Sequence, residues 1–83
     1  MVEAFVLVRV QPRRADETAN VMKNVKEEIL KIQGVKEIKG VFGRYDFVVI
    51  ADVKTIQELG SLVTDRIRSI RGVVETETQV VGF

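Results

Sequence analysis

Two stretches of the chain are apolar at nearly every position, and they predict the centre of a β-sheet. Val2 to Val10 carries charge only at Glu3 and Arg9, and Phe47 to Ala51 carries none. A strand that is covered on both faces has a continuous apolar run, whereas a strand with one wet face alternates. We therefore expect these stretches to be central strands that lie side by side.

Two helices are predicted from apolar residues that recur every three or four positions. The first begins around Ala15 or Asp16. The second begins at Thr55, whose spacing to Glu58 is that of a capping box. Their expected buried stripes are Ala15, Ala19, Met22, Val25, Ile29 and Ile32 in the first helix, and Ile56, Leu59, Leu62, Val63, Ile67 and Ile70 in the second.

A short repeat marks the end of each predicted helix. The segment Ile-Gln-Gly-Val at 32–35 recurs 38 positions later as Ile-Arg-Gly-Val at 70–73. Gly34 and Gly72 are each expected at the C′ position of a helix, where a left-handed residue costs little. The repeat indicates a duplicated unit of strand, helix and strand.

The two remaining strands are predicted at the edges of the sheet. Val35 to Phe42 carries three charged residues, and Val73 to Phe83 alternates polar and apolar residues. Charge on an edge strand discourages pairing with another chain. Residues 1–83 are therefore predicted to form a single α+β domain. Its fold would be a ferredoxin-like βαββαβ sandwich, or α–β plait, with an antiparallel sheet of order 4-1-3-2 and both helices on one face.

The central strands also predict an assembly. Both of their faces are apolar, but two helices cover only one face of such a sheet. The other face would expose an apolar patch to water. We expect a second copy of the chain to cover it, so that two sheets pack together in a homodimer.

The segment from Gly40 to Asp46 is the candidate functional site. Gly43-Arg44 matches a two-residue type II′ hairpin, and a longer loop that starts at Gly40 is the alternative. Asp46 has two interpretations. As a structural residue it accepts hydrogen bonds from loose hairpin amides or pairs with Arg44. As a ligand residue it holds an α-ammonium group, while amides freed by the two glycines meet an α-carboxylate.

Composition narrows the possible chemistry. The chain has a net charge of +1 and no cysteine or histidine. It lacks the basic face that nucleic-acid binding needs, so no direct contact with nucleic acid is expected. Thiolate or imidazole metal sites are excluded, and no cofactor or metal is predicted. No stretch approaches the ~20 apolar residues of a membrane helix, and we expect a cytoplasmic protein without a membrane partner.

Catalysis is the competing interpretation, as in a small dimeric ferredoxin-like monooxygenase or isomerase. Acid–base chemistry would fall to Asp46, Asp52, Glu3 or Tyr45. Only Asp46 and Tyr45 stand together beside a glycine turn. Paired carboxylates, a nucleophile elbow and a phosphate loop are missing. The sequence therefore favours a protein that is not an enzyme.

Two segments together resemble a known family. The turn Gly-Arg-Tyr-Asp within 41–49 and the ending Gly-Val-x-x-Thr-x-Thr within 72–81 are similar to those of the C-terminal effector domain of the Lrp/AsnC transcription regulators. This is the RAM domain, for regulation of amino acid metabolism. The resemblance runs over essentially the whole chain. Full-length members carry an N-terminal helix-turn-helix, which has no counterpart here, so the chain looks like a stand-alone RAM module or an isolated domain.

The resemblance implies a function in sensing. Family members dimerise through their sheets and assemble into octamers or decamers, and a small effector, usually an amino acid, binds between dimers. The chain would then modulate transcription by assembly with itself or with full-length Lrp/AsnC regulators. An ACT-like regulatory domain is the alternative beside a small enzyme. Carried over by position, the resemblance nominates for the ligand pocket Gly43, Tyr45, Asp46, Thr76 and Thr78.

Overall fold

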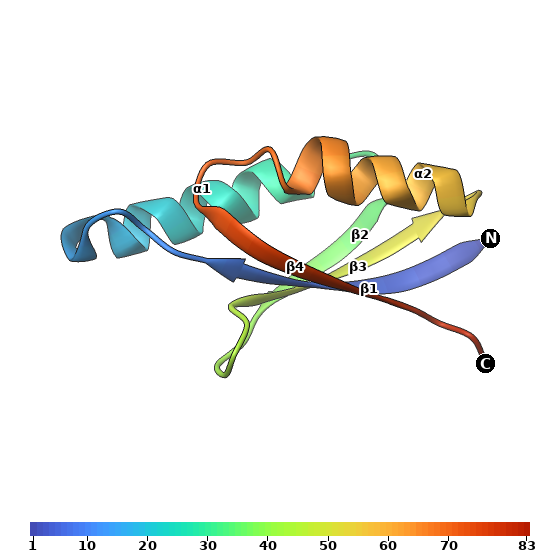
Figure 1. Cartoon of the computed structure of the whole chain (residues 1–83), viewed down its shortest axis with the longest axis horizontal. Coiled ribbons are helices and arrows are strands. Elements are labelled where there is room, and N and C mark those ends of the chain that lie inside the picture. The colour runs from blue at the N-terminus through green and yellow to red at the C-terminus, as the bar shows by residue number, and fades with distance from the viewer.

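Four antiparallel strands form one layer of the domain, and the helices lie on one face of this sheet (Figure 1). The computed structural model describes residues 1–83. The strand order is β2-β3-β1-β4, which is the predicted order seen from the other edge. The predicted ferredoxin-like arrangement, with apolar strands at the centre, is therefore confirmed. The strands are β1 (Val2–Val10), β2 (Val35–Gly40), β3 (Phe47–Val53) and β4 (Val73–Val80).

The helical layer has two parts. A 3₁₀ turn, η1 (Ala15–Glu17), leads into α1 (Thr18–Leu30), and α2 (Ile56–Ser61) continues as a π-helical turn, η2 (Leu62–Ile67). The predicted capping box is present at the start of α2. The Thr55 hydroxyl accepts from the Glu58 amide at 3.1 Å, and the Glu58 carboxylate accepts from the Lys54 amide at 2.9 Å. The wider turn of η2 closes where Arg68 N–H donates to the Val63 carbonyl at 2.9 Å.

The core lies between the helices and the sheet, and it contains only apolar side chains. Alternate residues of β1 and β3 point into it because successive side chains of a strand face opposite ways. Val6 and Val49 are completely buried there, in one cluster with the helical side chains Ile29 and Ile67. Each such side chain contributes about 1.5–3 kcal/mol to folding by leaving water.

The helices end earlier than predicted. α1 ends at Leu30 and η2 at Ile67, so Gly34 and Gly72 lie in the turns that follow and not at C′ positions. Both glycines nevertheless have positive φ angles, 100° and 102°. The placement was wrong because hydrogen bonds of 3₁₀ type, such as that from the Val35 amide to the Ile32 carbonyl, tighten the chain after the last helical turn.

The two glycine turns also connect the halves of the duplicated fold. The Gly34 carbonyl accepts from the Asp52 amide in the second half, and the Gly72 carbonyl accepts from the Gln11 amide in the first, both at 2.8 Å. Each half thus holds the end of a central strand that belongs to the other half.

Other boundaries also differ from prediction. β2 ends at Gly40 and not Phe42, and β4 ends at Val80 and not Phe83. Three residues of the predicted buried stripes are exposed, namely Ala15, Ala19 and Ile56. Figure 1 shows the first turns of α1 extending beyond the sheet. Periodicity defines the inward face of a helix but not how far the sheet beneath it reaches.

The second face of the sheet carries no helix, and we call it the open face. Its centre consists of two cross-strand pairs, Phe5 with Ile50 and Leu7 with Val48. Phe5 is 39% exposed although the strand around it is central. The expected apolar second face is therefore present.

No helix of the chain is both long enough and apolar enough to span a membrane. No group of three or more acidic, histidine or cysteine side chains is arranged to hold a metal ion.

Candidate functional site

Residues 41–46 connect β2 to β3, and we call them the 41–46 loop. Its ends are joined by the Val41 amide, which donates to the Asp46 carbonyl at 2.9 Å. The two-residue type II′ turn is therefore wrong, and the longer loop is correct. Gly43 has a φ of 148°, a backbone conformation that residues with a side chain rarely adopt. This glycine lets the backbone turn at the loop tip.

Asp46 ties the loop to β1 from both its backbone and its side chain. Its amide donates to the Val8 carbonyl at 2.9 Å, and its Oδ2 accepts from the Val10 amide at 2.7 Å. The carboxylate thus replaces a strand carbonyl and extends the β1–β3 ladder past its last residue pair. This matches the structural interpretation in kind, but the amide belongs to β1 and not to the hairpin. Oδ1 makes no hydrogen bond within the chain.

Tyr45 and Arg44 reach across to β4. The Tyr45 hydroxyl donates to Glu77 at 3.2 Å, and the Arg44 guanidinium lies 3.7 Å from Glu75. Arg44 is therefore paired with β4 and not with Asp46. Its guanidinium carbon also lies 5.9 Å from the centre of the Tyr45 ring. Lost hydration, followed by the charges of Glu75 and Glu77, raises the pKa of Tyr45, so this hydroxyl remains a hydrogen-bond donor.

Thr76 and Thr78 lie on the other side of the sheet. In the β1–β4 register they stand opposite Val8 and Val6, whose side chains face the helices. Glu77, between them, faces the open side, where it meets Tyr45. A single protomer therefore does not bring the two threonines together with Tyr45. A pocket that contains all five nominated residues needs a second chain.

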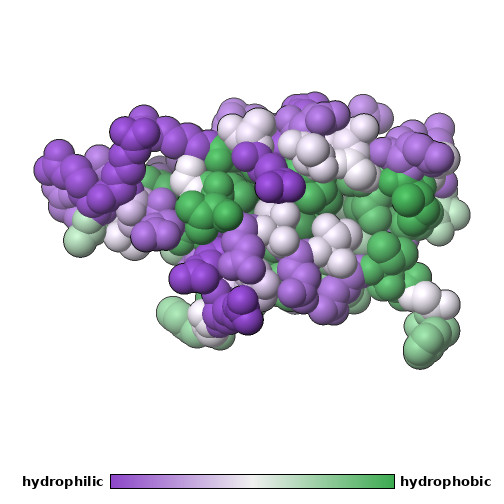
Figure 2. Space-filling model, viewed as in Figure 1, coloured by the Kyte–Doolittle hydropathy of each residue, from purple (hydrophilic) through white to green (hydrophobic).

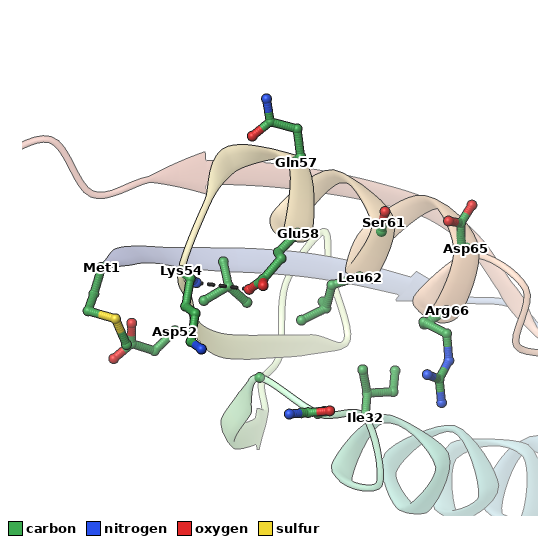
Figure 3. A pocket seen from close by; sticks show the side chains of 13 residues that line it. Met1, Ile32, Asp52, Lys54, Gln57, Glu58, Ser61, Leu62, Asp65 and Arg66 are labelled. Carbon is green, nitrogen blue, oxygen red and sulfur yellow. Dashed lines mark hydrogen bonds between the residues drawn. The ribbon is translucent and has the colours of Figure 1, made fainter.

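A cavity of about 700 Å³ lies at the other end of the sheet, and no sequence motif pointed to it (Figure 3). Its apolar lining comes from Met1, Ile32, Val53 and Leu62, and Asp65 and Arg66 of η2 also line it. The capping box predicts where α2 begins, but it does not predict the gap that α2 leaves beside the end of α1. The sequence signals near the cavity, the capping box and the repeat at 32–35, therefore indicated only local structure.

The sequence of the chain matches the family described as the Lrp/AsnC ligand binding domain over residues 3–82. The chain belongs to the Lrp/AsnC family. The predicted resemblance is therefore confirmed, and this is a ligand-binding domain related to transcription regulators.

Curated relatives of this Lrp/AsnC domain include uncharacterized HTH-type transcriptional regulators from two Pyrococcus species. The protein from Pyrococcus abyssi is 35% identical over 77 residues, which cover 93% of this chain and 49% of the relative. The protein from Pyrococcus furiosus is 36% identical over the same shares. The chain thus spans about half the length of the curated relatives it matches.

Solved structures share the fold of this chain. The protein TTHA0845 from Thermus thermophilus is 34% identical, with a TM-score of 0.86 and coverage of 100% of this chain and 95% of that one. The transcriptional regulator NMB0573 from Neisseria meningitidis, solved as an L-Met complex, has a TM-score of 0.84 at 17% identity, over 99% of this chain and 50% of that one. At that identity the second likeness shows the fold alone.

Proposed function

We propose that this Lrp/AsnC domain binds a small amino-acid effector at the 41–46 loop and couples that binding to its own assembly. The observation that carries the proposal is the hydrogen bonding of the Asp46 carboxylate. One carboxylate oxygen is held by the Val10 amide at 2.7 Å, while the other makes no hydrogen bond within the chain. A carboxylate that is fixed in place with a free oxygen is suited to receive an ammonium group, because charge-assisted hydrogen bonds are the strong ones.

The rest of the pocket would come from the loop and from a neighbouring chain. With Gly43 at its tip, the loop would offer backbone amides to an α-carboxylate, and Tyr45 would form one wall. Thr76 and Thr78 lie on the helix side of β4, so in this proposal they are contributed by the neighbour. The L-Met complex of NMB0573 supports an amino acid as the class of ligand.

Assembly would begin with two protomers joined at their open faces, and such dimers would then associate into octamers or decamers. A ligand bound between chains shifts association only by its greater affinity for the assembled form. The regulatory output would be transcriptional, through self-assembly or through joint assembly with full-length Lrp/AsnC regulators in the cytoplasm.

A catalytic role is less well supported by the geometry. The two acid–base candidates that stand together do not hydrogen-bond each other: Asp46 accepts from the Val10 amide through one oxygen, and Tyr45 donates to Glu77. The raised pKa of Tyr45 also makes it a poor base near neutral pH. We therefore propose a regulatory domain and not an enzyme.

Thermal-shift measurements against the twenty amino acids, followed by sedimentation velocity on each hit, test this proposal. A ligand at 100 times its Kd stabilises the protein by about 2.7 kcal/mol, which gives a clear rise in Tm. We expect Asp46→Asn to abolish the shift, because the amide cannot offer an anionic oxygen to an ammonium group. Asp16→Asn, on the exposed turn η1, is the matched control. The absence of any shift at millimolar amino acid would count against the proposal.

A further inference from the structure

The Phe42 side chain stands free of its own protomer. It is 107% exposed, and Val41 beside it is 38% exposed. In Figure 1 the loop between β2 and β3 leaves the sheet on the side away from the helices. Figure 2 shows an apolar projection at the same place, at the lower left. An exposed phenylalanine that becomes buried in an interface removes a large apolar area from water.

The base of this projection is fixed to the sheet. Val41 and Asp46 are joined at 2.9 Å, and Asp46 holds the Val8 carbonyl and the Val10 amide of β1. On the β4 side, Arg44 and Tyr45 contact acidic residues. Because both ends of the loop are held, Phe42 is presented to a partner in a defined place, and little ordering is needed on binding.

The surface beside the loop indicates which partner it meets. Charges of both signs surround the apolar centre of the open face, and most of them pair within the chain. These pairs are Arg9 with Glu75 at 3.5 Å, Lys39 with Glu37 at 3.4 Å, and Lys36 with Asp52 at 3.8 Å. This surface has no excess of one sign of charge that would attract a strongly basic or strongly acidic partner. A second copy presents the same apolar centre and the same balanced rim, as a twofold interface requires.

We propose that the Phe42 side chain of each protomer packs against the open face of a second copy and thereby stabilises the dimer. This inference rests on the proposed association of two open faces and adds the residue that strengthens it. The contact is reciprocal, so each dimer contains two Phe42 side chains. Each would pack against apolar side chains of β1 and β3 on the partner.

The test compares Phe42→Ser with Phe42→Leu and with Ile56→Ser. Ile56 is the matched control, because it is 58% exposed but belongs to α2 on the helix side. Sedimentation equilibrium should show that Phe42→Ser raises the dimer Kd by at least ~30-fold, as expected for the loss of an aromatic anchor. Phe42→Leu should retain most of the affinity, and Ile56→Ser should match the wild type. Circular dichroism of dilute protein should be unchanged in all variants.

A photo-crosslinking residue at position 42 gives a second measurement. The expected products join position 42 of one chain to peptides of β1 or β3 of another. An unchanged dimer Kd in Phe42→Ser, or crosslinks only to helical peptides, would overturn the role of Phe42. Neither result would refute the dimer itself. Loss of higher assemblies with an intact dimer would also overturn this role, since Phe42 would then act between dimers. A wild type that stays monomeric would instead refute the association of open faces itself.

Discussion

The carboxylate of Asp46 accepts a hydrogen bond from the amide of Val10 at 2.7 Å, across 36 positions of sequence. This bond joins the candidate ligand loop to the end of a central strand. Asp46 therefore has a structural task and a proposed ligand task at the same time, one for each carboxylate oxygen.

Substitution at Asp46 should separate these two tasks. Asp46→Ala leaves the partly buried Val10 amide without an acceptor, and we expect it to lower the free energy of unfolding by about 1–2 kcal/mol. Asp46→Asn keeps an acceptor oxygen, so it should lower the free energy of unfolding by less. It nevertheless removes the charge that would bind an ammonium group. Urea unfolding of both variants measures the difference. Equal stability of Asp46→Ala and the wild type would show that the bond contributes nothing.

Tyr45 should make stability depend on alkaline pH. Its pKa is raised in the folded protein above the ordinary value of 10.0, chiefly by lost hydration and then by Glu75 and Glu77. The folded state therefore holds the phenolic proton more tightly than the unfolded state. This contribution is fully present below the ordinary pKa and is lost as pH rises through the folded pKa.

The experiment is direct because Tyr45 is the only tyrosine and the chain has no tryptophan. Ultraviolet titration of the folded and the urea-unfolded protein should give a higher pKa for the folded state. Tyr45→Phe should remove this part of the loss of stability at high pH. A folded pKa at or below the unfolded one would contradict the desolvated setting of Tyr45 beside Glu75 and Glu77.

The sequence was sufficient to predict the strand order, because that order follows from a local property. β1 and β3 lie at the centre since residues such as Phe5 and Ile50 are apolar where an edge strand would carry charge. The geometry of the loop was not predictable in the same way. The loop is closed by the bond from Val41 to Asp46 and joined to β1 by the bond from Val10 to Asp46, and no local pattern reveals these contacts.

The arrangement of the nominated site residues shows the same limit. Alternation alone places Thr76 and Thr78 on one face of β4 and Glu77 on the other. Which of these faces the helices depends on the pairing with β1, where the register shifts between Arg9 and Val10. The relation of the threonines to Tyr45 therefore required the three-dimensional structure.

Replacement of the glycine in either turn, Gly34 or Gly72, should destabilise the domain even when the new side chain is only a methyl group. A Cβ at Gly34 would lie 2.9 Å from a methyl of Val53, and one at Gly72 would lie 2.7 Å from a methyl of Val21. Both positions also have a positive φ. We expect Gly34→Ala and Gly72→Ala each to destabilise the domain by about 2 kcal/mol. Gly60→Ala is the control.

Gly60 lies in α2, and a Cβ there would meet no atom within 4 Å. Alanine is the better helix former, so Gly60→Ala should stabilise the domain by about 0.5–1 kcal/mol. Denaturant unfolding of the three variants measures these opposite signs. Similar stabilities for all three would mean that the turns relax to accept a side chain.

A charge at the centre of the open face should prevent the proposed dimer and leave the fold intact. Leu7 is half-buried there, opposite Val48 and Glu77, and its side chain points away from the core. Leu7→Lys keeps a flexible ammonium in water while the protomer is alone, but association would remove both this ammonium and the opposite Glu77 carboxylate from water, and the desolvation of buried charges costs several kcal/mol. Leu30→Lys is the control, because Leu30 is 49% exposed at the end of α1.

Sedimentation equilibrium should therefore find Leu7→Lys monomeric at concentrations where the wild type and Leu30→Lys are dimeric. Circular dichroism should give the same secondary structure for all three proteins. A dimer of undiminished affinity in Leu7→Lys would place the interface elsewhere on the molecule. In that case the apolar centre formed by Phe5, Leu7, Val48 and Ile50 would face solvent, or a partner other than this chain.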